Sequence, residues 1–108
     1  MKNTVKLNRE FTYAYKKGAK LVTGTLVFYW YKNRRSQTKL GLTVSPALGG
    51  AVLRNRLKRL MRASFGARKD DIRGGYNIII AARAKMARVE FAQIQKDLDF
   101  CLEKAELV

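Results

Sequence analysis

The chain has 108 residues, of which 47% are hydrophobic, and 23 Lys and Arg against 8 Asp and Glu give it a formal net charge of +15. This length fits one compact domain over residues 1–108, and the composition excludes extensive disorder. The single cysteine excludes a disulfide framework. So much positive charge indicates a polyanionic partner, with nucleic acid favoured over an anionic membrane surface.

The charge is uneven along the chain. Five acidic and two basic side chains give residues 89–108 a net charge of −3, so the preceding 88 residues carry +18. We therefore expect the C-terminal segment to face away from the polyanion. No apolar run resembles a signal peptide or reaches the roughly 18 residues of a membrane span, so we expect a cytoplasmic protein.

The first predicted element is a helix that Asn8 caps and Lys17 ends, with a glycine directly after it. Phe11 and Tyr15 are spaced i, i+4 and therefore share one face of this helix, with Leu7 a turn earlier. The helix should pack through this aromatic face.

Strand structure is predicted next. Residues from about 20 to 32 are β-branched and aromatic, and Gly24 divides them into two strands or marks a bulge. The polar residues 33–38 predict a hairpin loop, and residues 39–45 predict the strand that pairs with the one before it. A proline and two glycines then end this strand.

The second half of the chain contains a helix from about Ala51 to Phe65, a loop at 69–75 and a strand at 76–82, which is apolar enough for the centre of a sheet. The last predicted helix begins at about Val89. Its apolar residues recur at helical spacing: Phe91, Ile94, Leu98, Cys101, Leu102 and Ala105. This order of elements indicates the α+β class, with helices packed on a mixed sheet.

The helix predicted over residues 51–65 separates its charges from its apolar side chains. At 100° per residue, the aliphatic side chains and Phe65 fall on one side, and a cationic strip with one amide falls on the other. The strip comprises Arg54, Asn55, Arg56, Lys58, Arg59 and Arg62. We expect the apolar side to enter the core and the strip to face outward.

Two interpretations of this strip compete, a solvated helix face and a phosphate-binding surface. Solvated faces usually mix charges, because i, i+4 ion pairs stabilise a helix by about 0.2–0.5 kcal/mol and like pairs destabilise it by similar amounts. Arg54, Lys58 and Arg62 instead form a like-charge row. Arg54 and Arg56 also lie near the helix N-terminus, where the macrodipole disfavours cations. A locally unfavourable pattern favours the phosphate-binding interpretation.

The aromatic strand alternates between two faces of the predicted sheet. One face receives side chains that we interpret as core: Leu26, Phe28 and Trp30. The other receives Val27, Tyr29 and Tyr31. These tyrosines, with Phe11 and Tyr15, are either covered as core or form a platform on which unpaired bases stack. The pattern alone favours neither.

The residue types offer little for catalysis. The chain has no histidine to act as a general base. Asp70 and Asp71 are sequence neighbours, whose side chains do not readily converge on one metal ion. Cys101 lies in an apolar helical stripe and is interpreted as core. We therefore expect no catalytic residue and no metal site in this chain.

The sequence AVLRNRLKRLMRASF (51–65) resembles the signature helix of the bacterial ribonuclease P protein subunit, in which Arg-Asn-Arg precedes x-Lys-Arg-x-x-Arg. Three further segments match the family in the same order: REFTYAYKKGAK its first helix, LGLTVS the strand before the signature, and YNIIIAAR the strand after it. The resemblance implies an α-β-β-β-α-β-α sandwich of helices on a mixed four-stranded sheet. This fold is related to a ribosomal-protein domain and has an unusual left-handed βαβ crossover.

The resemblance also implies a function. The family assists a catalytic RNA in the endonucleolytic removal of the 5′ leader from precursor tRNA. The RNA carries out the chemistry, with Mg²⁺ bound mainly by the RNA subunit and the substrate. The implied partners are this catalytic RNA and the leader, with no membrane and no obligate protein partner.

Site residues are implied position by position. Contacts to the catalytic RNA are implied for Arg54, Asn55, Arg56, Arg59 and Arg62. A cleft for the single-stranded leader is implied at Phe11, Tyr15, Val27 and Tyr29, with Lys58 at its edge. Pro46 and Ala47 stand where the family commonly has a basic pair, and Gly50 where Asn or Lys is usual. We expect no RNA contact from residues 46–50.

Two other functions fit the composition. A general RNA-binding or ribosomal protein would use the same surfaces without a leader groove, and would bind precursor and mature tRNA equally. A cationic protein of the membrane surface would need a broad exposed apolar face, whereas the apolar residues of 51–65 are needed for the core.

Overall fold

The computed structural model describes residue 5 and residues 8–108. In this part of the chain, three helices and four strands occur in the order α1 (Asn8–Lys17), β1 (Ala19–Val22), β2 (Leu26–Lys32), β3 (Lys39–Thr43), α2 (Ala51–Gly66), β4 (Tyr76–Ala82) and α3 (Phe91–Lys104). Short 3-10 helices occupy Pro46–Leu48, Lys69–Asp71 and Ala84–Arg88. The predicted α+β class and order of elements are confirmed.

The four strands form one sheet in the order β1-β2-β4-β3. Strand β2 is antiparallel to both β1 and β4, whereas β3 is parallel to β4. The predicted hairpin between residues 26–32 and 39–45 is therefore wrong, because β4 lies between them. Strand β4 is buried on both faces of the sheet. Ile78 and Ile80 point into the larger core on one face, and Ile79 points into the smaller cluster on the other. A strand buried in this way occupies the interior of a sheet, with a neighbouring strand on each side.

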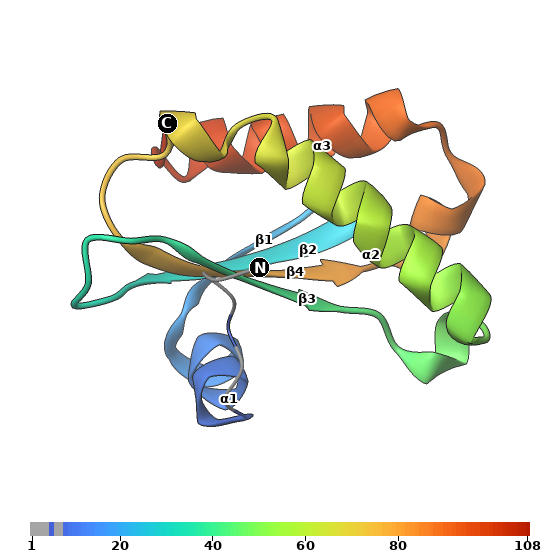
Figure 1. Cartoon of the computed structure of the whole chain (residues 1–108), viewed down its shortest axis with the longest axis horizontal. Coiled ribbons are helices and arrows are strands. Elements are labelled where there is room, and N and C mark those ends of the chain that lie inside the picture. The colour runs from blue at the N-terminus through green and yellow to red at the C-terminus, as the bar shows by residue number, and fades with distance from the viewer. Residues whose placement is uncertain (1–4, 6–7) are drawn as a thin grey trace.

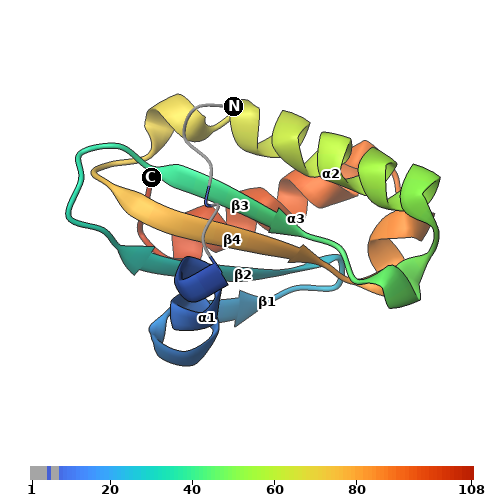
Figure 2. The same ribbon diagram turned by 60° about the horizontal axis from the view of Figure 1, so that its bottom comes forward.

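The helices cover opposite faces of this sheet. Figure 1 shows α2 and α3 on one face and α1 on the other, and Figure 2 shows α1 in front of the strands. Strand β3 lies in front of β4 in Figure 1, both run to the right, and α2 returns above the sheet. The β3–α2–β4 crossover is therefore left-handed, as the family resemblance implies, although parallel connections are right-handed with few exceptions.

Most of the core lies between the sheet and the α2–α3 layer. Leu26 and Phe28 of β2 are fully buried there, and Trp30 packs against the same cluster, as predicted. A smaller apolar cluster under α1 consists of Val5, Ala14 and Ile79, with Phe11, Tyr29 and Tyr31 packed against it. Because side chains of β2 point alternately to the two faces of the sheet, this strand contributes residues to both clusters.

The helix termini differ slightly from the predictions. Asn8 is the first residue of α1 and not the residue before it, while Lys17 ends α1 as predicted. The expected contribution of Leu7 lies outside the described residues. Helix α3 begins at Phe91, two residues later than predicted.

The apolar stripe predicted for α3 is correct except at its first residue. Ile94, Leu98, Cys101 and Leu102 are buried, whereas Phe91 is 41% exposed. Helical spacing gives the direction of a side chain but not whether another element lies opposite it, so the prediction fails at the end of the helix.

Candidate nucleic-acid interface

The cationic strip lies on α2, as predicted. Leu57, Met61, Ser64 and Phe65 on the inner side of this helix are buried. Asn55, Arg56, Arg59 and Arg62 are exposed, and Arg54 and Lys58 are half-buried. The helix thus has one side in the core and presents its charges along the other.

No acidic side chain among residues 8–108 forms an ion pair with the cations of the strip. The ion pairs found within residues 8–108 involve Lys39 and Arg68 as the cations, and none involves a cation of α2. The Nε of Arg54 donates a hydrogen bond to the carbonyl of Gly49 at 3.2 Å, which holds this side chain against the start of the helix. The remaining charges face solvent, where a polyanion can approach them.

The N-terminus of α2 adds to this positive potential. The N-cap residue is Gly50, which has no side chain to accept hydrogen bonds from the first backbone N–H groups, and the first turn contains no acidic residue. Unsatisfied N–H groups and the helix dipole both favour an anion at such a terminus. The strip therefore begins at a helix end that attracts phosphate.

A second surface, which we call the aromatic surface, consists of Phe11, Tyr15, Val27 and Tyr29 on the α1 side of the sheet. The ring centroids of Tyr15 and Tyr29 lie 4.9 Å apart in an edge-to-face arrangement, and those of Phe11 and Tyr15 lie 6.4 Å apart. Tyr15 is 45% exposed, while the other three are half-buried. The structure therefore brings these four predicted residues together on one face.

Two features hold the aromatic surface in place. Gly41 of β3 allows Phe11 to approach the sheet closely, because a Cβ at this position would lie 3.0 Å from the Phe11 ring. The Tyr15 phenol lies close to the Thr43 side chain. Burial raises the pKa of the Tyr15 phenol, and the neighbouring Tyr29 raises it further, although the Thr43 side chain acts in the opposite direction. Tyr15 is therefore neutral at physiological pH.

Lys58 lies on the other side of the sheet from the aromatic surface. It lies on α2, which covers the face of the sheet opposite to the aromatic surface, next to β3. The structure thus groups the four residues of the aromatic surface and leaves Lys58 with the cationic strip.

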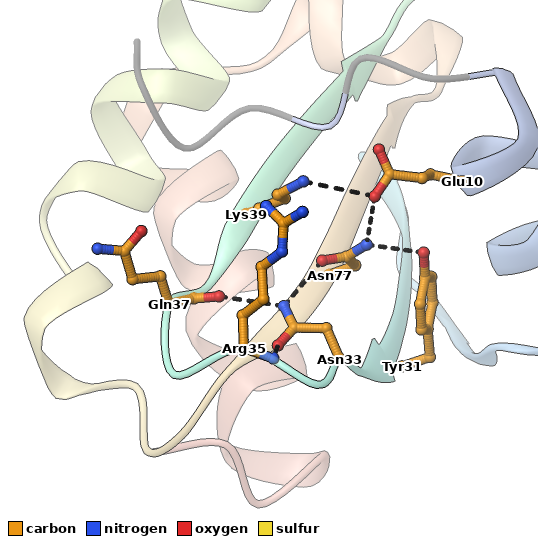
Figure 3. Close-up of polar contacts among 7 residues, drawn as sticks. All are labelled: Glu10, Tyr31, Asn33, Arg35, Gln37, Lys39 and Asn77. Atoms are coloured by element: carbon orange, nitrogen blue, oxygen red, sulfur yellow. Dashed lines mark hydrogen bonds and ion pairs between the residues drawn. The ribbon is translucent and has the colours of Figure 1, made fainter.

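Sequence reasoning missed a third group of polar and aromatic residues beside the loop 33–38. The Tyr13 ring packs edge-to-face on Tyr31 with centroids 4.7 Å apart, and Asn77 is buried between Glu10 and Tyr31. Figure 3 shows Glu10, Tyr31 and Asn77 of this group beside the loop. Its members come from three separate elements, so no local sequence pattern marks it.

The acidic residues that the structure describes are not arranged as metal ligands. Within the described chain, no three His, Cys, Asp or Glu side chains are placed to hold one metal ion. Asp71 pairs with Arg68 at 3.1 Å, and Asp99 pairs with the same arginine at 2.9 Å. No helix among the described residues is long and apolar enough to cross a membrane.

The sequence model of the Ribonuclease P family matches residues 1–106. The ribonuclease P protein component of Oceanobacillus iheyensis is 38% identical over 106 residues, which cover 96% of this chain and 87% of that protein. A structure of the Staphylococcus aureus ribonuclease P protein aligns with a TM-score of 0.88 at 35% identity, covering 97% of this chain and 96% of that one. The ribonuclease P protein of Thermotoga maritima aligns with a TM-score of 0.84 at 30% identity, covering 94% and 96%.

These matches extend over nearly the whole chain, and the structural alignments agree with the fold of three helices and a mixed four-stranded sheet described above. The chain belongs to the family of bacterial ribonuclease P protein components, the protein subunits of the endoribonuclease that processes the 5′ end of precursor tRNA.

Proposed function

We propose that the cationic strip of α2 binds the catalytic RNA of ribonuclease P. The contacts would be made by Arg54, Asn55, Arg56, Arg59 and Arg62. Exposed guanidinium groups without carboxylate partners form strong charge-assisted hydrogen bonds to phosphates. The observation that carries this proposal is that α2 seals its apolar side into the core while no acidic residue in the described chain pairs with its cations.

The aromatic surface would bind the single-stranded 5′ leader of the precursor. Unpaired bases stack on aromatic side chains, with a contribution of about 1–3 kcal/mol per base. The exposed Tyr15 and half-buried Tyr29 supply such a surface, and Phe11 and Val27 supply its apolar floor. Lys58, which lies on α2 beside the edge strand β3, would contact a phosphate of the same leader after the leader passes around this edge of the sheet.

The role of this chain would be binding and electrostatics, with no catalytic residue of its own. Catalytic RNA and precursor tRNA repel each other, and a basic protein between them lowers that repulsion. The described carboxylates do not form a metal site, so we place the Mg²⁺ ions that support phosphodiester hydrolysis on the RNA subunit and substrate. The assembly would act in the cytoplasm, where precursor tRNA is processed, without a membrane or an obligate protein partner.

Reconstitution tests this proposal directly. The chain would be added to a cognate RNA subunit at low Mg²⁺, and leader removal would be followed together with the affinities for precursor and mature tRNA. We expect the chain to restore leader removal and to increase affinity for the precursor alone. Equal affinities for both tRNAs would show a general RNA-binding protein and contradict the leader-binding proposal.

A further inference from the structure

The aromatic surface has direct neighbours on the edge strand β1. In the strand register, Lys20 of β1 lies opposite Tyr29 of β2, and Val22 lies opposite Val27. Leu21, between the two β1 residues, packs against the larger core, so Lys20 and Val22 both point to the α1 face. Directly opposite residues of an antiparallel pair have Cβ atoms about 4.5–5.5 Å apart. Each β1 side chain is therefore adjacent to a residue of the aromatic surface.

The row of side chains that begins at Val22 crosses the whole sheet beyond α1. It continues through Val27 to Ala81 of β4 and Thr43 of β3. Helix α1 packs on β2 and β4, and in Figure 1 and Figure 2 the strands continue past this helix towards the turn between β1 and β2. Val22 is 53% exposed, and the other three side chains are half-buried. A partly open band of sheet therefore runs beside the aromatic rings and ends on β1.

Lys20 places a positive charge at the β1 end of the neighbouring row. Its side chain is exposed and forms no ion pair among the described residues. Along this row, Tyr29 is followed on β4 by Ile79, which is fully buried in the cluster under α1. The row is thus closed towards β4 and open towards β1. The lysine lies at the open end, directly beside a ring that we propose contacts the leader.

The order of the strands gives the leader a direction across this face. Strand β3, beside Lys58 of α2, is one edge of the sheet, and β1 is the other. A leader that passes around the β3 edge and reaches Tyr29 on β2 has already crossed β4, so its next step leads onto β1. Neighbouring strands lie about 5 Å apart. A phosphate next to the base at Tyr29 therefore comes within reach of the Lys20 ammonium.

A lysine on an edge strand can also have a role that involves no nucleic acid. Lysines at such edges prevent pairing with the sheet of a second molecule. Single-stranded nucleic acid, in contrast, is bound by cations that contact its backbone beside aromatic rings on which its bases stack. Lys20 and Tyr29 form such a pair, and the exposed Val22 adds an apolar contact beside them. The two roles predict different effects of substitution.

We propose that the leader continues from the aromatic surface onto β1, where Lys20 contacts a leader phosphate and Val22 contacts the adjoining sugar or base. This inference rests on the proposed function, because it requires the leader to lie on the aromatic surface. It extends that site by one strand, so that the leader crosses the sheet from the β3 edge to the β1 edge.

The test combines Lys20→Ala with single neutral phosphates in the leader. The reconstituted holoenzyme is titrated with mature tRNA and with precursors that carry one methylphosphonate at each leader position in turn. We expect Lys20→Ala to weaken precursor binding by about 2- to 5-fold, the effect of an exposed ion pair, and to leave mature tRNA binding unchanged. The slope of log precursor affinity against log salt should fall by about 0.7. At one leader position, the methylphosphonate should abolish the effect of the substitution.

Further variants sharpen this test. Lys20→Arg retains the charge and should retain precursor affinity, whereas Lys20→Glu reverses the charge and should weaken binding more than Lys20→Ala does. Val22→Asp places a negative charge in the neighbouring row and should also weaken precursor binding. Lys96→Ala, which removes an exposed charge from α3, is the matched control and should change precursor affinity little.

The outcomes separate this inference from the function on which it rests. If Lys20→Ala leaves precursor affinity unchanged or couples to no leader phosphate, or if Val22→Asp binds the precursor normally, the leader leaves the sheet before β1, although Tyr29→Ala still reports leader binding. If Lys20→Ala weakens both tRNAs equally, or weakens binding of the RNA subunit without substrate, the lysine contacts another RNA segment and the inference is wrong.

A third result would assign Lys20 to protection of the sheet edge. In that case Lys20→Ala would make the free protein self-associate in sedimentation without changing precursor affinity, and the inference would again be wrong. If Tyr29→Ala has no effect on precursor affinity, the proposed function itself fails, and this inference fails with it.

Discussion

The two faces of the sheet are built from the same strands, but their side chains are buried to different extents. The face under α2 and α3 contains the larger core, where Phe28 and Ile80 are fully buried. The face under α1 has a cluster of three buried residues, and around it lie aromatic side chains that remain partly exposed, such as Tyr15 and Tyr29. Figure 2 shows α1 over this face.

This difference separates stability from recognition along β2. Successive residues of a strand point to opposite faces, so Phe28 contributes to the closed core while Tyr29 contributes to the aromatic surface. Substitutions on the closed face should therefore affect the free energy of unfolding, and substitutions on the α1 face should affect binding. The predictions below test this separation, from the largest expected effect to the smallest.

The largest effect is expected on the closed face. Phe28→Ala should lower the free energy of unfolding by about 3–5 kcal/mol, because it leaves a cavity under α2 and α3. Urea unfolding monitored by circular dichroism measures the loss. Tyr29→Ala, one residue along the same strand, is the matched control and should cost less. Equal losses at the two positions would contradict the difference between the faces.

The next effect concerns the outer side of α2. Arg56→Ala should weaken binding of the RNA subunit by about 10- to 150-fold, because hydrogen bonds to charged groups contribute about 1.5–3 kcal/mol. The slope of log affinity against log salt should fall by about one unit. Arg54→Ala should weaken assembly as well, and it also removes the hydrogen bond to Gly49.

A matched control for Arg56→Ala is Lys96→Ala on α3, which removes one exposed positive charge outside the cationic strip. The control should change affinity little. If both variants weaken binding equally, only the net charge matters, and the strip is not a specific interface. Unchanged dissociation constants for Arg56→Ala at physiological ionic strength would contradict the assignment.

Substitutions on the α1 face should change how strongly the holoenzyme prefers precursor over mature tRNA. Tyr29→Ala or Phe11→Ala should lower the ratio of precursor to mature tRNA affinity by about 5- to 150-fold, the equivalent of one stacked base. Fluorescence titration of the holoenzyme with both tRNAs gives this ratio. If the ratio is unchanged while the circular dichroism spectrum is that of the wild type, the aromatic surface does not bind the leader.

The boundaries of the elements could be predicted from the sequence because they depend on local features. Hydrophobic periodicity, the glycines and the single proline between segments mark the helices and strands, and the prediction of 51–65 differs from α2 by one residue. The partner of β2 could not be predicted in the same way. Strand pairing is non-local, and β4 is separated from β2 by the whole of β3 and α2.

The candidate site shows the same division. The cationic strip is a property of one helix, so its position and its separation from the core follow from 3.6 residues per turn. The polar group around Asn77 has no such signal, because Glu10, Tyr31 and Asn77 come from three elements. Asn77 appears in the sequence as one polar residue before an apolar strand, and only the fold shows that three side chains bond to it.

A smaller effect on stability is expected where the β1–β2 turn meets α3. The Thr25 hydroxyl donates to Asp97 Oδ2 at 2.7 Å, and the Thr25 backbone N–H donates to the same oxygen at 3.3 Å. Thr25→Val keeps the side-chain volume and the backbone bond but removes the hydroxyl, so it should cost about 1 kcal/mol of unfolding free energy. Thr12→Val, at an exposed position of α1, is a control that should cost less. A neutral Thr25→Val would show that α3 is held on β2 by apolar contacts alone.

The mildest test uses the chemistry of one thiol on the closed face. Cys101 is the only cysteine, it is fully buried, and burial raises the pKa of its thiol from the ordinary 9.0 to about 12, with a further contribution from Asp97. Because the thiolate is the reactive form, the folded chain should resist iodoacetamide at pH 8, whereas the urea-unfolded chain should react completely. Mass spectrometry after a timed quench measures both. Rapid alkylation of the folded chain would mean that the α2–α3 layer opens readily, and the closed face would then be no more closed than the α1 face.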